Sequence, residues 1–191
     1  MSQSENAELN LSEAVKKAVY NAAENINEDL DSEYQFKVYS VWTKVENYDV
    51  SIEIDLSYSI KLYEISESIN EGFSDYIARI EEEEGRELNE EEIEEEWDRI
   101  YNEELEEINN EYVYPIEGEI EVDLSGVYPF YSGKLEVYIK PLCCGGDYCD
   151  VGSYIEIKFK AIRIETIEKA SDKFQEFLTD LLRLIHSIIT L

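Results

Sequence analysis

The stretch VSIEIDLSYSIKLYEISESI, residues 50–69, decides the fold because its hydrophobic period changes midway. From Val50 to Leu62 apolar and polar residues alternate strictly, which predicts a strand with one buried and one solvated face. From Ile65 onward the apolar residues recur every three or four positions, as on one side of an α-helix. A strand that leads directly into a helix predicts a fold that combines a sheet with helices.

The segments around this stretch continue both patterns. Residues 34–45 are rich in β-branched and aromatic residues and predict a strand that forms a long hairpin with residues 50–62. Helical spacing marks residues 11–30, with Asn10 or Ser12 as the expected cap, and a C-terminal segment that starts at about Glu165. Further alternating segments predict three more antiparallel strands: 116–124, 135–139 and 155–161.

The predicted fold is therefore α+β, with the element order α-β-β-α-α-β-β-β-α. About five antiparallel strands form a sheet, and the N- and C-terminal helices cover one of its faces. The C-terminal helix has an apolar sector so wide that it is either buried against the sheet or shared with a second copy of the chain. We expect residues 1–191 to form a single domain, with an acidic helical hairpin inserted at residues 64–111.

The inserted hairpin is predicted by two apolar stripes at helical spacing, one within residues 65–80 and the other within residues 93–108. Gly85 separates the two helices. Asn89, followed three residues later by Glu92, is a suitable cap for the second helix. Two amphipathic helices joined by a short turn are expected to pack along their apolar stripes.

This hairpin holds most of the net charge. The chain has 46 acidic and 16 basic residues, a net charge of −30. Residues 64–111 contain 21 acidic residues against three arginines and no lysine, so they carry 18 of these negative charges. At ~1.5 Å per residue, a helix of about 22 residues is about 33 Å long, so the hairpin has roughly one net charge per ~1.8 Å of axis. Duplex DNA has one charge per ~1.7 Å.

Such a charge density predicts a surface that binds a basic protein. A rod of carboxylates spaced like duplex phosphates imitates nucleic acid and suits the groove of a DNA- or RNA-binding protein. Two other interpretations stay open: a solvated surface that only promotes solubility, and a surface that binds metal ions. The residues expected to face the basic partner are Glu81, Glu82, Glu83, Glu84, Glu87, Glu91, Glu94, Glu95, Asp98, Glu103 and Glu106.

Repulsion within the hairpin favours recognition over solubility. Like charges at i,i+4 each destabilise a helix by up to ~0.5 kcal/mol, and most solvated faces relieve this repulsion with lysine. The hairpin contains no lysine. A face that stays acidic at a cost in stability more often serves binding.

The composition argues against several other functions. A net charge of −30 repels phosphate backbones and anionic membranes, so we expect direct binding to neither nucleic acid nor membrane. The chain has one histidine, His186, and lacks both a nucleophile–base arrangement and a phosphate-binding loop. We therefore expect no catalytic residue, no cofactor and no resident metal. Asp123 with Glu156 and Lys158 is a nuclease-like pattern for Mg²⁺, but the latter two are also ordinary polar positions of an alternating strand.

The three cysteines lie in the loop PLCCGGDYCDVG between the last two predicted strands. A disulfide from Cys143 or Cys144 to Cys149 would pin this loop. Free thiols and a metal site are the alternatives. A zinc site would need Asp147 or Asp150, or a second copy of the chain, to complete its ligands.

Aromatic residues near Pro115 and Pro129 form a further candidate surface. In these loops they either cap the core or anchor a partner, in the second case by cation–π contact with arginine. The residues are Tyr112, Tyr114, Tyr128, Phe130 and Tyr131.

The leading interpretation is a non-enzymatic cytoplasmic protein that inhibits or chaperones a basic nucleic-acid-binding protein. Its charge and size suggest DNA-mimicking anti-defence inhibitors of viruses or mobile elements, including the anti-CRISPR type, which act in the host cytoplasm. Abundant Ile, Glu and Tyr with scarce Met and Gln are typical of hyperthermophile proteins. The alternatives are a structural protein that self-associates, for instance as a homodimer, through the C-terminal helix, and a metal-dependent nuclease.

Overall fold

The computed structural model describes residues 3–30, 34–60, 62–111, 117–142, 152–164 and 167–190. Its elements follow the order α-β-β-α-α-β-β-β-α, which confirms the predicted α+β fold. The chain divides into two compact units. Unit 1 comprises Met1–Ser59 and Pro115–Leu191, and unit 2 comprises Ile60–Tyr114.

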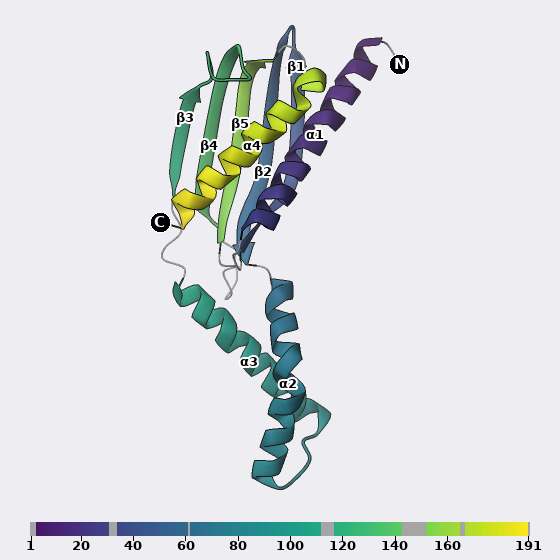
Figure 1. Ribbon diagram of the computed structural model, residues 1–191, viewed down its shortest axis with the longest axis vertical. Helices are drawn as coiled ribbons and strands as arrows, with labels where there is room; N and C mark the ends of the chain where they lie inside the picture. Colours follow the sequence, from purple (N-terminus) through teal and green to yellow (C-terminus); the bar gives the residue numbers. More distant parts are fainter. Residues whose placement is uncertain are drawn as a thin grey trace. The chain divides into compact units, whose positions relative to one another are not determined.

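Unit 1 is built on a five-stranded antiparallel sheet with the strand order β1-β2-β5-β4-β3 (Figure 1). The pairing of β5 with β2 joins the first hairpin of the chain to its last three strands. β3 and β1 are the outer strands. The strands span Tyr34–Glu46 (β1), Asp49–Ile60 (β2), Gly118–Asp123 (β3), Ser132–Pro141 (β4) and Gly152–Arg163 (β5).

An apolar ladder crosses the centre of this sheet. Ile157 of β5 lies opposite Ile54 of β2 on one side and Val137 of β4 on the other. All three residues are buried. Because side chains alternate along a strand, the next pair, Asp55 and Glu156, points to the other face. The alternation in residues 50–62 therefore divides β2 between the core and an open polar face.

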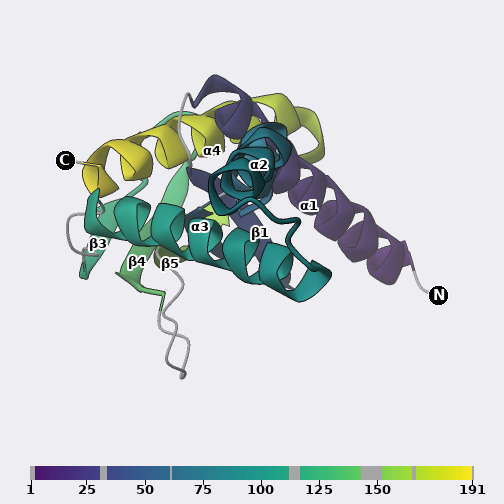
Figure 2. The ribbon, with the colours of Figure 1, turned by 90° about the horizontal axis from the view of Figure 1, so that it is seen from below.

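The two terminal helices, α1 (Gln3–Asp29) and α4 (Ile167–Ile189), are in contact and lie on the same face of the sheet (Figures 1 and 2). Small residues let α1 approach its neighbours closely, and α4 contributes larger side chains. The buried apolar residues of α1 are Val15, Ala18, Val19, Ala22, Ala23 and Ile26. Those of α4 are Ile167, Phe174, Leu178, Leu182, Ile185 and Ile189.

Helix α1 begins earlier than the sequence pattern predicts. It starts at Gln3, so the expected caps Asn10 and Ser12 lie inside the helix. The residues before Asn10 include alanine and glutamate, which favour helix, and acidic residues in a first turn interact well with the helix dipole. Residues 3–9 contain no helix-breaking glycine or proline, so the helix extends beyond Asn10 towards the N-terminus. The expected cap position was therefore wrong.

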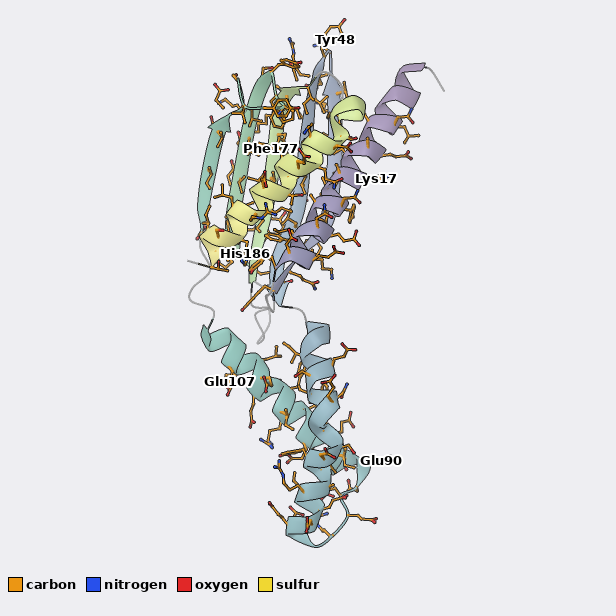
Figure 3. All side chains as sticks on the ribbon, in the orientation of Figure 1. Lys17, Tyr48, Glu90, Glu107, Phe177 and His186 are labelled. Carbon is orange, nitrogen blue, oxygen red and sulfur yellow. The ribbon has the colours of Figure 1, made fainter. Side chains whose placement is uncertain are left out.

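Phenylalanines fill the core between α4 and the strands β4 and β5. Phe159 stacks on Phe130 with ring centroids 5.8 Å apart, and Phe174 meets Phe159 edge-on at 5.4 Å. Phe177, labelled in Figure 3, meets Phe130 edge-on at 4.9 Å. Such offset and edge-to-face arrangements stabilise a core beyond the area that the rings bury.

The pairing of β4 with β5 shifts register between Ser132 and Lys134. Gly133, between them, has a φ of 123°, which side-chain-bearing residues rarely adopt. A Cβ atom there would lie 2.7 Å from the Cα of Ile162. Only glycine fits this position, and it lets the two strands stay paired beyond the irregularity.

Unit 2 is a helical hairpin of α2 (Leu62–Glu84) and α3 (Glu90–Glu111), which contact each other. Trp97 of α3 stacks on Tyr101 at 5.0 Å and donates its indole N–H to Asn70 of α2 at 3.0 Å. Ile69 and Ile77 of α2 are buried. The two predicted stripes thus line the inside of the hairpin.

None of the described helices, in either unit, is long and apolar enough to cross a membrane.

Candidate functional site

The outward surface of α3 carries a row of carboxylates. Ile93, Trp97 and Ile100 lie on one side of the helix, and five exposed acidic residues lie on the opposite side, within about 120° of the circumference at ~3.6 residues per turn. We name these five residues the acidic face. The acidic face consists of Glu91, Glu94, Glu95, Asp98 and Glu106.

The acidic face runs along most of α3. Glu90 and Glu107, labelled in Figure 3, lie near the two ends of this helix. From Glu91 to Glu106 the helix rises ~22 Å at ~1.5 Å per residue. Packing of the apolar stripe holds the helix in one rotation about its axis, so the five carboxylates keep a constant orientation.

Three of the eleven residues expected to bind a partner have partners inside the hairpin. Glu81 accepts a hydrogen bond from the backbone N–H of Leu88 at 2.9 Å. Glu84 and Glu103 each form an ion pair with an arginine, at 2.9 and 2.7 Å. The other eight are exposed and form no ion pair within the described residues: Glu82, Glu83, Glu87, Glu91, Glu94, Glu95, Asp98 and Glu106.

The connection between the helices is closed by Arg86 and Glu92. The guanidinium of Arg86 donates to both carboxylate oxygens of Glu92, at 2.9 and 2.8 Å. Glu92 also accepts the N–H of Asn89 at 2.9 Å, and its own N–H donates to the Asn89 side chain at 3.1 Å. This reciprocal pair is the expected capping box. The hydrogen bonds from Arg86 and then from Asn89 lower the pKa of Glu92 to about 2.

A second cluster, inside the hairpin, uses the other two arginines. Tyr76 of α2 donates to Glu96 of α3 at 2.9 Å, and Arg99 donates to the same carboxylate at 2.8 Å. The hydrogen bond from Arg99 and then that from Tyr76 lower the pKa of Glu96. Arg79 lies over the ring of Tyr76, 5.7 Å from its centroid. All three arginines of the hairpin are thus engaged within it, and the acidic face stays uncompensated.

The open face of the sheet in unit 1 carries a different cluster. Oxygen atoms of Glu53, Asp55 and Glu156 lie within 4.8 Å of one another, a spacing that suits a divalent cation. Lys158 already lies 2.8 Å from Glu156 and 3.7 Å from Glu53, so an ammonium group neutralises part of this charge. Tyr154 donates to Asp55 at 2.6 Å. Burial, followed by this hydrogen bond, raises the pKa of Tyr154.

The nuclease-like residues are not brought together. Asp123 lies at the end of β3 opposite Lys134, whereas Glu156 of β5 lies opposite Tyr138, and β4 separates the two strands. The carboxylate of Asp123 accepts the backbone N–H of Ser125 at 2.8 Å, which closes a turn. The three residues of that pattern therefore do not form one metal site.

His186 is half-buried beside the core of unit 1. Its Nδ1 and the hydroxyl of Tyr58 share a hydrogen bond of 2.8 Å, and the two rings meet edge-on. Burial lowers the pKa of His186. Figure 3 labels His186 on α4. Its half-buried position and its contact with the buried Tyr58 favour a structural role for this side chain.

The loop aromatics divide between the core and the surface. Phe130 is buried and stacks in the phenylalanine cluster, whereas Tyr128 and Tyr131 are 73% and 63% exposed. The remaining two aromatics of the predicted group, Tyr112 and Tyr114, lie outside the described residues. So do the three cysteines: Cys143, Cys144 and Cys149.

The interactions among Tyr76, Glu96 and Arg99 have no signal in the sequence pattern. Tyr76 directly precedes a core residue of α2, and no helical period specifies which carboxylate of the other helix it meets. Only the packing of α2 against α3 determines that its partner is Glu96.

No protein-family model, curated protein or solved structure matches the chain. The chemistry of these surfaces is therefore the only basis for a functional proposal. Of the two carboxylate clusters, the acidic face of α3 is exposed and forms no ion pair within the described residues. The carboxylates on the sheet are largely engaged by Lys158 and Tyr154.

Proposed function

We propose that this protein is a non-enzymatic acidic binding protein whose hairpin occupies the nucleic-acid site of a basic protein and so inhibits or chaperones it. The observation that carries the proposal is the acidic face of α3, where the carboxylates are exposed while every arginine of the hairpin is engaged elsewhere. The anti-defence inhibitors of viruses and mobile elements are the class of protein that this function would suit.

The hairpin charge supports a partner that normally binds phosphates. Residues 64–111 carry 18 of the 30 net negative charges. A charge concentrated in this way steers a basic partner from a distance and makes the encounter fast and salt-sensitive. Over the whole hairpin the net charge of roughly one per ~1.8 Å is close to the ~1.7 Å of duplex DNA. The acidic face alone presents five carboxylates over ~22 Å, so the remaining exposed carboxylates of the hairpin must contribute to the long-range field.

Self-association through α4 is the alternative of another class. Six apolar residues of α4 are buried in unit 1, so they serve the core of their own chain. Leu184, 56% exposed, is the one large hydrophobic residue of α4 among the described residues that stays on the surface. The burial of this helix therefore favours the first proposal over assembly through α4.

The proposal is tested by capture with matched charge variants of the full chain. In the first variant Glu91, Glu94 and Glu95 become Gln and Asp98 becomes Asn. In the control, the same substitutions are made at four exposed acidic residues of unit 1: Glu13, Glu24, Glu28 and Asp172. Both variants lose four negative charges, so only the place of the charge differs.

Proteins captured from a thermophile lysate are identified by mass spectrometry. We expect the wild-type chain and the control to retain a basic nucleic-acid-binding protein that the acidic-face variant loses. The apparent affinity should fall with salt, and the acidic-face variant should show a weaker salt dependence than the control. Equal retention by both variants would contradict the proposal.

A further inference from the structure

Strand β3 is an outer strand of the sheet with an accessible edge. Within the described residues it pairs with β4 and with no other strand (Figure 1). All six of its residues are exposed. Half of the backbone N–H and C=O groups of an edge strand point away from its neighbour, so β3 offers unpaired hydrogen-bonding groups to another chain.

Three of the usual protections of an edge strand, which are lysine, proline and a bulge, are missing from β3. The charged side chains that β3 does carry are all acidic, so they protect it against uncharged and acidic strands but not against a basic one. Residues 117–123 contain neither lysine nor proline, and the register shift of β4 lies in its pairing with β5. The pairing of β3 with β4 is regular from Gly118 to Asp123. The edge is therefore a suitable template for one more strand.

Apolar and acidic side chains alternate along this segment. Ile120 and Val122 lie opposite Val137 and Leu135 on the helix-covered face, yet they are 40% and 38% exposed. Acidic residues occupy every second position on the other face, about 6.8 Å apart at ~3.4 Å per residue. These residues are Glu117, Glu119, Glu121 and Asp123.

The carboxylates of β3 are only partly neutralised. Lys134 of β4 lies 2.5 Å from one oxygen of Glu121, whose side chain is still 51% exposed. Glu119 accepts a hydrogen bond from Tyr138, which raises the pKa of that tyrosine to about 12. An incoming strand on the open side of β3 would thus meet ionised carboxylates beside exposed apolar groups.

The acidic side chains of β3 determine which kind of strand can pair with its open edge. In a pair of β3 strands from two copies, Glu119 and Glu121 would lie beside like charges, which destabilises cross-strand pairs. The net charge of −30 on each chain adds long-range repulsion. We propose that β3 binds an extended segment of another protein in which basic and apolar residues alternate. This strand surface belongs to unit 1 and does not require the hairpin to bind anything.

The probe for this surface is a synthetic heptapeptide of alternating lysine and valine. The control peptide has the same composition, with the lysines grouped before the valines. Binding to the full chain is measured by fluorescence anisotropy, and hydrogen exchange locates the bound peptide. We expect the alternating peptide to slow exchange by about tenfold or more at alternate amides of residues 118–123.

A matched pair of variants separates the charge of β3 from the general negative charge of the chain. Glu119→Gln with Glu121→Gln should weaken binding of the alternating peptide about fivefold or more, because two cross-strand ion pairs are lost. Glu24→Gln with Glu28→Gln removes the same charge from the exposed surface of α1 and should change the affinity less than about twofold.

Several results would overturn the β3 proposal. One is equal binding of the two peptides, and another is protection confined to α2 and α3. Absence of binding would also overturn it. Concentration-dependent protection of β3 without peptide would instead assign this edge to a second copy of the chain. The function proposed for the hairpin depends on none of these results, because it is tested by the captured protein and the acidic-face variant.

Discussion

The hydroxyl of Tyr58 and Nδ1 of His186 share a part-buried 2.8 Å hydrogen bond that ties strand β2 to helix α4 in unit 1. Tyr58 is fully buried, and Phe36 packs against its ring with centroids 5.0 Å apart. The bond links two segments that lie 128 residues apart in the chain. It connects the first hairpin of the sheet to the last helix.

This pair predicts a pH dependence of stability. Burial lowers the pKa of His186 below its usual value of 6.5, so folding favours the neutral ring. As the pH falls through 6.5, the unfolded chain binds the proton first, and the free energy of unfolding decreases until the pH passes the pKa of the folded state. His186 is the only histidine, so comparing urea unfolding of the wild-type chain and of His186→Gln at pH 7.5 and 5.5 separates its effect from that of the carboxylates. His186→Gln should remove the decrease, and an unchanged pH dependence in this variant would contradict the assignment.

The loop around Phe130 gives a prediction about packing. Phe130→Ala removes a buried ring that contacts Phe159 and Phe177, and should reduce the free energy of unfolding by about 3–5 kcal/mol. Tyr128→Ala and Tyr131→Ala remove exposed rings and should change it by about 0.5 kcal/mol or less. Denaturant unfolding of the three variants measures the difference. Similar losses in all three would show that the exposed tyrosines also support the core.

The contacts of Arg86 and Asn89 with Glu92, between α2 and α3, predict a low pKa for the Glu92 carboxyl. Because Arg86 and Asn89 bind the charged carboxylate, the pKa of Glu92 falls from 4.5 to about 2. The stabilisation from this cap is present above pH 4.5 and is lost as the pH falls through the range down to about 2. Carbon NMR of the Glu92 carboxyl should show a midpoint near 2, and Arg86→Leu should raise it towards 4.5, because Arg86 is the largest cause of the shift.

Arg79→Leu serves as the control for this titration. Arg79 lies over Tyr76 and does not contact Glu92 within the described residues, so its removal changes the charge of the hairpin equally without touching the cap. The Glu92 midpoint should stay near 2 in this variant. A similar rise in both variants would mean that the net charge of the hairpin, and not the hydrogen bonds of Arg86, sets the pKa.

Local sequence patterns predicted the elements of the fold well. The alternation in residues 50–62 corresponds to β2, although the strand ends at Ile60 and Leu62 already belongs to α2. The stripes of residues 65–108 correspond to α2 and α3. Asn89 and Glu92 form the expected cap. These features depend on neighbours within a few residues, which is why a single sequence was enough to predict them.

Features that depend on how separate elements of the chain pack together could not be predicted. Several segments alternate in the same way, so nothing in the pattern indicates that β5 pairs with β2 or that Tyr154 reaches Asp55. The expected acidic surface was also too broad. Glu81, Glu84 and Glu103 have partners within the hairpin, and only the packing of the two helices separates them from the exposed carboxylates.

The acidic face itself gives the central prediction, which is that the hairpin competes with nucleic acid for one basic site. The direct measurement uses the purified captured partner with a fluorescent duplex or single strand bound to it. The wild-type chain should displace this nucleic acid. The variant with Glu91, Glu94 and Glu95 changed to Gln and Asp98 to Asn should need about tenfold more protein or beyond, because four ion pairs are removed. The account would be contradicted if this variant displaced the nucleic acid as well as the wild-type chain does, or if nucleic acid and protein bound the partner together.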